Sequence, residues 1–84
     1  MRRKININGS SQESLVEDYQ KALNALSDCL ENMSTVMPHG RDYLMNEHPQ
    51  NDYKSDRQEH LNNVVKIHEV RQYLHNCIVS IGTQ

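Results

Sequence analysis

The strongest constraint on this chain is a helical repeat of apolar residues between Leu15 and Val36. The residues follow one another at alternating spacings of four and three, the heptad pattern of a helix that packs along one face. The repeat is wider than a two-stranded coiled coil needs, and favours a bundle of several helices. Its members are Leu15, Tyr19, Ala22, Leu26, Cys29, Met33 and Val36, flanked by Val16, Leu23, Leu30 and Met37.

Capping and helix-breaking residues set the ends of this first helix. Ser10 and Glu13 match the capping box, in which the serine hydroxyl accepts a first-turn amide and the glutamate reaches back to the cap. Pro38 and Gly40 supply the stop signal, because a helix usually ends before a proline or at a glycine. The pattern predicts a helix from about residue 11 to about residue 37.

A second apolar repeat predicts a helix from about residue 53 to about residue 81. Asp52 or Ser55 begins it, and Ser55 opens a further capping-box pattern. We expect Pro49 to block any helix before that point, and Gly82 to end the helix. The apolar positions of this repeat are Leu61, Val64, Val65, Ile67, Val70, Tyr73, Leu74, Cys77, Ile78 and Ile81.

Two helices with one connection predict an all-α fold. We expect residues 1–84 to form a single domain: an antiparallel helical hairpin, with a strand-like N-terminal arm at 1–9 and a structured connection at 38–52. Apolar residues make up only 36% of the chain, and Phe and Trp are absent. Since a lone hairpin leaves much of both apolar stripes in water, we expect a homo-oligomer that completes a helical bundle.

Charge and hydropathy exclude several classes of protein. The formal net charge of −2 argues against nucleic-acid binding, because general nucleic-acid binders carry a strong basic excess. No apolar run approaches the length of a membrane span, and the first residues lack the apolar core of a signal peptide. We therefore expect an intracellular, cytoplasmic protein, in the host cytoplasm if the chain is viral. Cys29 and Cys77 are expected to be buried free thiols.

The second helix carries a stripe of basic side chains at helical spacing. His60, Val64, His68, Arg71 and His75 follow one another at spacings of four, four, three and four, so they share one face. Three interpretations compete. The stripe is a polar layer bonded to carboxylates of the first helix, an anion-binding pocket, or part of a zinc site. Strong zinc-binding patterns are absent, and we expect neither a metal nor a cofactor.

The connection contains "PHGRDY", a second candidate site. Pro38 and Gly40 favour a stiff turn that presents His39, Arg41, Asp42 and Tyr43. An arginine held in this way can bind phosphate, with a tyrosine beside it for stacking. Alternatively, Arg41 and Asp42 lock the loop onto the helices, and Tyr43, Leu44 and Met45 close the open end of the core. We expect "NEHPQND" to be surface turn.

The "PHGRDY" segment resembles one found in a small group of helical-hairpin proteins of phages and prophages. In that group, a second helix with a His or Arg follows shortly after, as Arg57 and His60 do here. This chain departs from the pattern at Leu44, where a second aromatic residue is expected. The resemblance implies a viral accessory context, in which some small proteins inhibit host defence by binding enzymes or by sequestering nucleotide signals.

These observations lead to one leading hypothesis for function and one alternative. The leading hypothesis is a non-enzymatic phage or prophage anti-defence protein that sequesters a small phosphorylated, nucleotide-like ligand. The alternative is a protein-interaction module that inhibits a host defence protein by direct binding. We do not expect an enzyme, because paired carboxylates, a nucleophile with its base and a phosphate-binding glycine loop are missing as recognisable patterns. The predicted ligand-binding residues are His39, Arg41, Asp42, Tyr43, Arg57, His60, Arg71 and His75.

Overall fold

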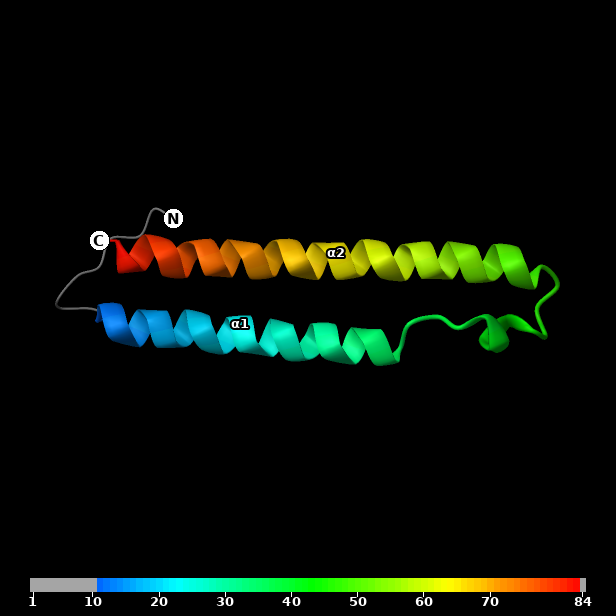
Figure 1. The fold of residues 1–84 in the computed structure, drawn as a ribbon, viewed down its shortest axis with the longest axis horizontal. Coiled ribbons are helices and arrows are strands. Elements are labelled where there is room, and N and C mark those ends of the chain that lie inside the picture. Colours follow the sequence, from blue (N-terminus) through cyan, green and yellow to red (C-terminus); the bar gives the residue numbers. More distant parts are fainter. Residues whose placement is uncertain (1–10, 84) are drawn as a thin grey trace.

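The computed structural model describes residues 11–83, which form two long α-helices and one short 3₁₀ turn. Helix α1 spans Gln12–Thr35, the turn η1 spans Gly40–Tyr43 and helix α2 spans Pro49–Gly82. The two helices run antiparallel and side by side, and the connection lies at one end of the pair (Figure 1). The all-α helical hairpin predicted from the two apolar repeats is confirmed, while the arm predicted at 1–9 lies outside the described residues.

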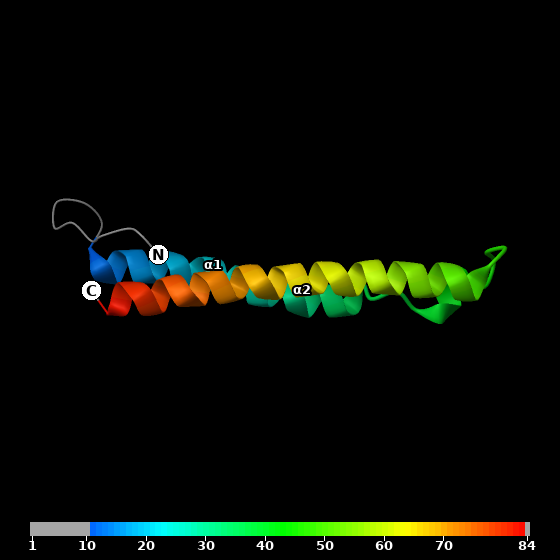
Figure 2. The same cartoon turned by 90° about the horizontal axis from the view of Figure 1, so that it is seen from above.

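The hairpin is long and thin, with extents of 62 × 19 × 16 Å and a radius of gyration of 18.9 Å. A compact domain of this length has a radius of gyration of about 12 Å. The view from above shows the two helices crossing at a shallow angle along most of their length (Figure 2). A pair of helices packed in this way buries one stripe of each helix and leaves the other sides in water.

The two helices differ in length. With 24 and 34 residues, α1 and α2 extend roughly 36 Å and 51 Å at the α-helical rise. The first turns of α2 therefore reach roughly 15 Å beyond the end of α1. The connection continues beyond the end of α1 alongside this overhang, and η1 packs against α2 (Figure 1). A long connection is thus needed to cover the part of α2 that α1 does not reach.

The ends of α1 lie close to those predicted. Its N-cap is Ser11, whose hydroxyl accepts a hydrogen bond of 3.1 Å from the Ser14 amide. The cap predicted at Ser10 is therefore one residue too early. The helix ends at Thr35, before Pro38, because the residue that precedes a proline is disfavoured in the helical conformation.

The predicted start of α2 is wrong by four residues. The helix begins at Pro49 rather than near residue 53, so part of the segment predicted as turn is helical and Ser55 lies inside the helix. Proline blocks the interior of a helix but fits its first position, where no amide hydrogen bond is required and the fixed φ already suits the helix. The first hydrogen bond of α2 joins the Asp52 amide to the His48 carbonyl at 3.0 Å.

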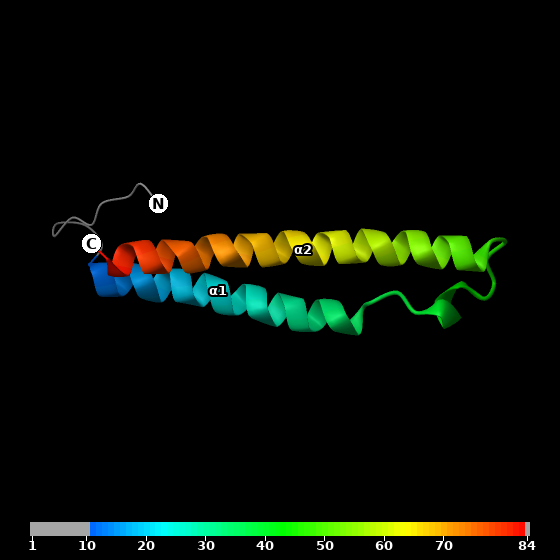
Figure 3. The same cartoon turned by 45° about the horizontal axis from the view of Figure 1, so that its top comes forward.

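The core lies at the end where α1 begins and α2 ends. Leu15, Leu23, Cys77 and Ile81 are the buried apolar residues of the described chain, and all lie in that half of the hairpin. The two ribbons are closest at this end and diverge toward the connection (Figures 1 and 3). The Gln12 side-chain amide donates to the Ile81 carbonyl at 2.8 Å, which ties the two helix ends together.

Much apolar surface remains exposed along the hairpin. Cys77 is a buried free thiol, as expected, whereas Cys29 is a free thiol that is only half-buried. The large apolar side chains that remain exposed are Val36, Leu44, Met45, Val65, Val70, Tyr73 and Val79.

We predict that a buried leucine of α1 and an exposed leucine of the connection differ sharply in their contribution to stability. Leu23 is 7% exposed and Leu44 is 73% exposed. Leu23→Ala should lower the free energy of unfolding by about 2–5 kcal/mol, because it leaves a cavity in a small core. Leu44→Ala should change it by less than about 0.5 kcal/mol. Urea unfolding followed by circular dichroism at one protein concentration measures both, and equal losses would contradict the location of the core.

Candidate functional site

The turn η1 is held by its own side chains. The His39 Nδ1 accepts a hydrogen bond of 3.2 Å from the Arg41 amide, and the Asp42 carboxylate accepts one of 3.2 Å from the His39 amide. The Asp42 amide also donates to the His39 carbonyl at 2.9 Å. This reciprocal arrangement is a capping box, which satisfies amides that would otherwise lack partners. Two of the predicted ligand-binding residues therefore have structural roles within the loop.

Tyr43 fastens the turn to α2. Its hydroxyl donates a hydrogen bond of 2.8 Å to the Asp56 carboxylate, and its ring lies 5.8 Å from that of Tyr53 at an angle of 59°. The hydrogen bond to Asp56, with smaller effects of burial and of the charges on Asp56, Asp42 and Asp52, raises the pKa of Tyr43 to about 12. The ring is half-buried. Tyr43 thus ties the turn to α2 at the end of the hairpin away from the buried core.

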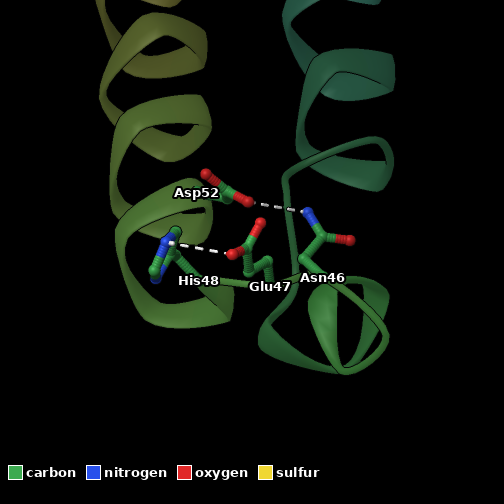
Figure 4. A network of polar contacts seen from close by, with 4 residues as sticks. All are labelled: Asn46, Glu47, His48 and Asp52. Carbon is green, nitrogen blue, oxygen red and sulfur yellow. Dashed lines mark hydrogen bonds and ion pairs between the residues drawn. The ribbon is translucent and has the colours of Figure 1, made fainter.

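A second polar contact joins the end of the connection to the first turn of α2. The Asn46 side-chain amide donates to the Asp52 carboxylate at 2.9 Å (Figure 4). The Asn46 backbone amide donates to the Tyr43 carbonyl at 3.0 Å. His48 and Glu47 lie 4.0 Å apart on the outer side of the same turn. That last pair is exposed and contributes little, whereas Asn46 fixes the path of the chain into α2.

Arg41 differs from its neighbours in the loop. Its side chain is exposed, and its guanidinium makes no hydrogen bond or ion pair with any other residue of the described chain. The Asp42 carboxylate accepts from the His39 amide and caps η1, and it makes no hydrogen bond or ion pair with Arg41 within residues 11–83. The loop is therefore locked without Arg41, which leaves the guanidinium available in solvent.

Arg57 and His60 lie on α2 close to the connection. His60 is half-buried, and its Nε2 donates a hydrogen bond of 2.9 Å to the Met33 carbonyl in the last turn of α1. Carbonyls in the last turn of a helix lack partners within the helix, so His60 satisfies one of them from the neighbouring helix. Arg57 follows Asp56 and is exposed. His60 is thus a structural contact, and Arg57 is a second exposed cation at this end.

Arg71 and His75 lie far from the loop. They follow Asp56, the partner of Tyr43, by roughly 22 Å and 28 Å along α2. The Arg71 Nε donates to the Ser27 hydroxyl at 3.0 Å, and His75 is exposed. The stripe does make polar contacts with α1, but its partners are a serine and a carbonyl rather than the predicted carboxylates. Within one chain, the eight predicted residues do not surround a single ligand.

The charge around the loop is acidic. Between residues 39 and 59 the chain has five carboxylates and three Lys or Arg side chains. The charges on Asp42, Asp52 and Asp56 also contribute to the raised pKa of Tyr43. An anionic ligand at Arg41 would therefore meet local repulsion. The five acidic residues are Asp42, Glu47, Asp52, Asp56 and Glu59.

Two apolar residues of the connection stand out in the structure. Leu44 and Met45 were predicted to close the core, but Leu44 is 73% exposed and Met45 is 96% exposed. We call these two residues the tip. They come directly after η1, so the turn directs them outward instead of toward the helices. A shallow hollow of about 220 Å³ lies beside the tip, lined by Gly40, Leu44, Pro49, Gln50 and Tyr53.

The partners of the predicted residues were not identified from the sequence. Asp56, Tyr53 and Ser27 stand at ordinary helical positions, and nothing in their spacing marks them as contacts of Tyr43 or Arg71. The tip carries a weak signal, because Leu44 and Met45 are adjacent apolar residues in an otherwise polar connection. Adjacent apolar residues are equally typical of a loop segment that is buried against the helices. Only the structure shows whether they are exposed or buried.

The described residues form neither a metal site nor a membrane span. Within residues 11–83, no three His, Cys, Asp or Glu side chains are grouped so that they could hold a metal ion. Neither helix of the described chain has an apolar stretch long enough to cross a membrane. Comparison with protein-family models, curated proteins and solved structures finds no match to this chain. The candidate site is therefore judged on its own geometry.

The bond between Tyr43 and Asp56 predicts an unusual alkaline titration. Of the four tyrosines, Tyr43 should ionise near pH 12, and Asp56→Asn should return its pKa toward 10. Because the folded pKa is the higher one, the bond contributes fully below about pH 10 and is lost as the pH rises toward 12. Tyrosinate absorbance, compared with a Tyr43→Phe variant, measures this. Asp52→Asn should give a smaller change, and equal changes in both variants would contradict the assignment.

The contacts of the loop predict that the adjacent residues Arg41 and Asp42 contribute differently to stability. Asp42→Ala removes the capping box and should cost about 1 kcal/mol, which is about 4–8 °C in Tm for a chain of this size. Arg41→Ala should change the stability by less than about 0.5 kcal/mol, because the guanidinium has no partner in the described chain. Thermal unfolding at one fixed protein concentration compares the two variants. A larger loss for Arg41→Ala would show that Arg41 belongs to the lock.

Proposed function

We propose that this protein is a non-enzymatic protein-interaction module that binds a partner polypeptide through the tip, Leu44 and Met45. The observation that carries the proposal is the exposure of these two large apolar side chains on a loop that is otherwise fixed by hydrogen bonds. Adjacent apolar side chains in water contribute nothing to the stability of the hairpin. They are suited to fill a pocket on another protein.

Rigid presentation favours binding by this loop. The capping box fixes η1, Tyr43 ties the turn to Asp56, and Asn46 ties the chain after the tip to Asp52. A loop fixed on both sides loses less conformational entropy on binding than a free one. Leucine and methionine fit this role, because both fill apolar pockets and methionine adapts to irregular ones.

The charge around the tip indicates the chemistry of the partner. The carboxylates of the loop and of the first turns of α2 outnumber the Lys and Arg side chains there by five to three. An apolar cleft bordered by Lys and Arg complements such a surface, and opposite charge also speeds the encounter of two proteins. We therefore propose a partner with a basic rim around an apolar pocket.

The resemblance to phage and prophage helical hairpins supplies a biological setting for the proposal. In that setting the partner is a host defence protein, which the tip inhibits by occupying a functional cleft. The alternative, sequestration of a nucleotide-like ligand, is favoured by Arg41, whose guanidinium has no partner within residues 11–83. The distance of Arg71 and His75 from the loop and the acidic surroundings count against it.

The proposal is tested by capture followed by measurement of affinity. The full chain is immobilised on a resin and incubated with bacterial host extract. Each protein enriched on the resin is then purified and titrated against the hairpin. Replacing both Leu44 and Met45 by Ser should weaken binding by about 10- to 100-fold, because two apolar contacts are lost. The matched control replaces Val65 and Val79, two exposed apolar residues of α2, by Ser, and should keep the affinity.

Two results would overturn the proposal. One is a purified partner that binds the tip variant and the wild type equally well. The other is calorimetric binding of a nucleotide that is lost in Arg41→Ala, with no protein partner enriched, which would support sequestration instead.

A further inference from the structure

A second apolar surface lies between the helices, at a distance from the tip. Leu15, Tyr19, Ala22 and Leu74, with Asp18 at the margin, line one open groove of about 280 Å³. Residues of both helices that line one groove lie on the same side of the hairpin. Val70 belongs to this side too, because it precedes Leu74 by one helical turn. We call Leu15, Tyr19, Ala22, Val70 and Leu74 the groove face.

The groove face is incompletely covered by the hairpin itself. Val70 is 49% exposed, Leu74 is half-buried, and Ala22 is exposed although it belongs to the apolar repeat of α1. The apolar stripe of each helix is thus wider than the strip that the other helix covers. Small Ala22 beside bulky Tyr19 and Leu74 gives the surface both a depression and projections. Helices pack when projections of one surface enter depressions of another.

We propose that a second copy of this chain docks on the groove face, so that two hairpins form a four-helix dimer. The apolar side chains left in water at this face support this occupant. Val70 is 49% exposed and Leu74 is half-buried beside the groove, so a second hairpin seated there would remove both from water. Because two-fold dimers use one surface twice, a face with both projections and a depression can pack against its own copy.

The shape of the hairpin supports the same occupant. A radius of gyration of 18.9 Å and an apolar groove between two long helices are what one half of a four-helix bundle presents. The proposal does not depend on the function proposed for the tip, since Leu74 lies roughly 30 Å along α2 from Tyr53, which contacts the loop. Loss of the dimer and loss of partner binding are measured separately.

Two valines of α2 give a matched test. Val79 follows Val70 by nine residues, which places it about 180° around the helix, on the opposite side from the groove face. The two have nearly the same exposure, 49% for Val70 and 52% for Val79. Val70→Glu puts two unpaired charges into a symmetric interface and should weaken the dimer by at least about 100-fold, while Val79→Glu should leave it intact.

Sedimentation equilibrium of the full chain measures the outcome. We expect a wild-type mass of twice 9.8 kDa, a Val79→Glu variant of the same mass and a Val70→Glu variant near the monomer. A monomeric wild type at about 100 µM would overturn the proposal, since it would put the Kd above the range of stable dimers. So would an oligomer that Val79→Glu disrupts as strongly as Val70→Glu.

A milder pair of substitutions serves as the test if the Val70→Glu variant loses its helical structure. Val70→Ala and Val79→Ala both introduce alanine, which favours the α-helix. Circular dichroism should therefore show the same helix content in the two variants. Val70→Ala should raise the Kd of the dimer by about 10-fold or more, because each dimer loses two buried valine side chains. Equal Kd values for the two alanine variants would overturn the proposed location of the interface.

Discussion

The unequal length of the two helices is the constraint on which the rest of the structure depends. Because α2 has 34 residues and α1 has 24, the hairpin cannot pair helix with helix over its whole length. The connection must cover the remaining turns of α2, and it does so with a 3₁₀ turn and side-chain hydrogen bonds. One end of the molecule is therefore held by buried apolar residues and the other end by polar contacts.

This division follows from the chemistry of the two ends. Leu15, Leu23, Cys77 and Ile81 pack where the helices are closest, so water is excluded there. Where the helices diverge, the last carbonyls of α1 and the first amides of α2 need partners, and His60 supplies one of them. Hydrogen bonds fix direction better than apolar contacts do, because they fail outside a narrow range of geometry. The polar end is thus suited to present a loop in one orientation.

The sequence predicted the helices well, because their apolar repeats report directly which side chains can be buried together. It predicted the boundary at Pro49 wrongly, since a proline that stops one helix and a proline that starts another look alike in a sequence. The roles of His39, Asp42 and Tyr43 were also ambiguous. Side chains suited to bind a ligand are equally suited to bind the backbone or a carboxylate of their own chain.

The separation of Arg41 from the lock bears on how such a loop can acquire a function. Every hydrogen bond that fixes η1 uses His39, Asp42, Tyr43 or a backbone group, so Arg41 and the tip are free to vary without loss of the fold. A surface that contributes little to stability can be selected for binding alone. The apolar groove face is different, because burial there would add to the small core while it joins two chains. Binding at the tip and assembly along the helices therefore place separate demands on the sequence, and a change in one surface need not disturb the other.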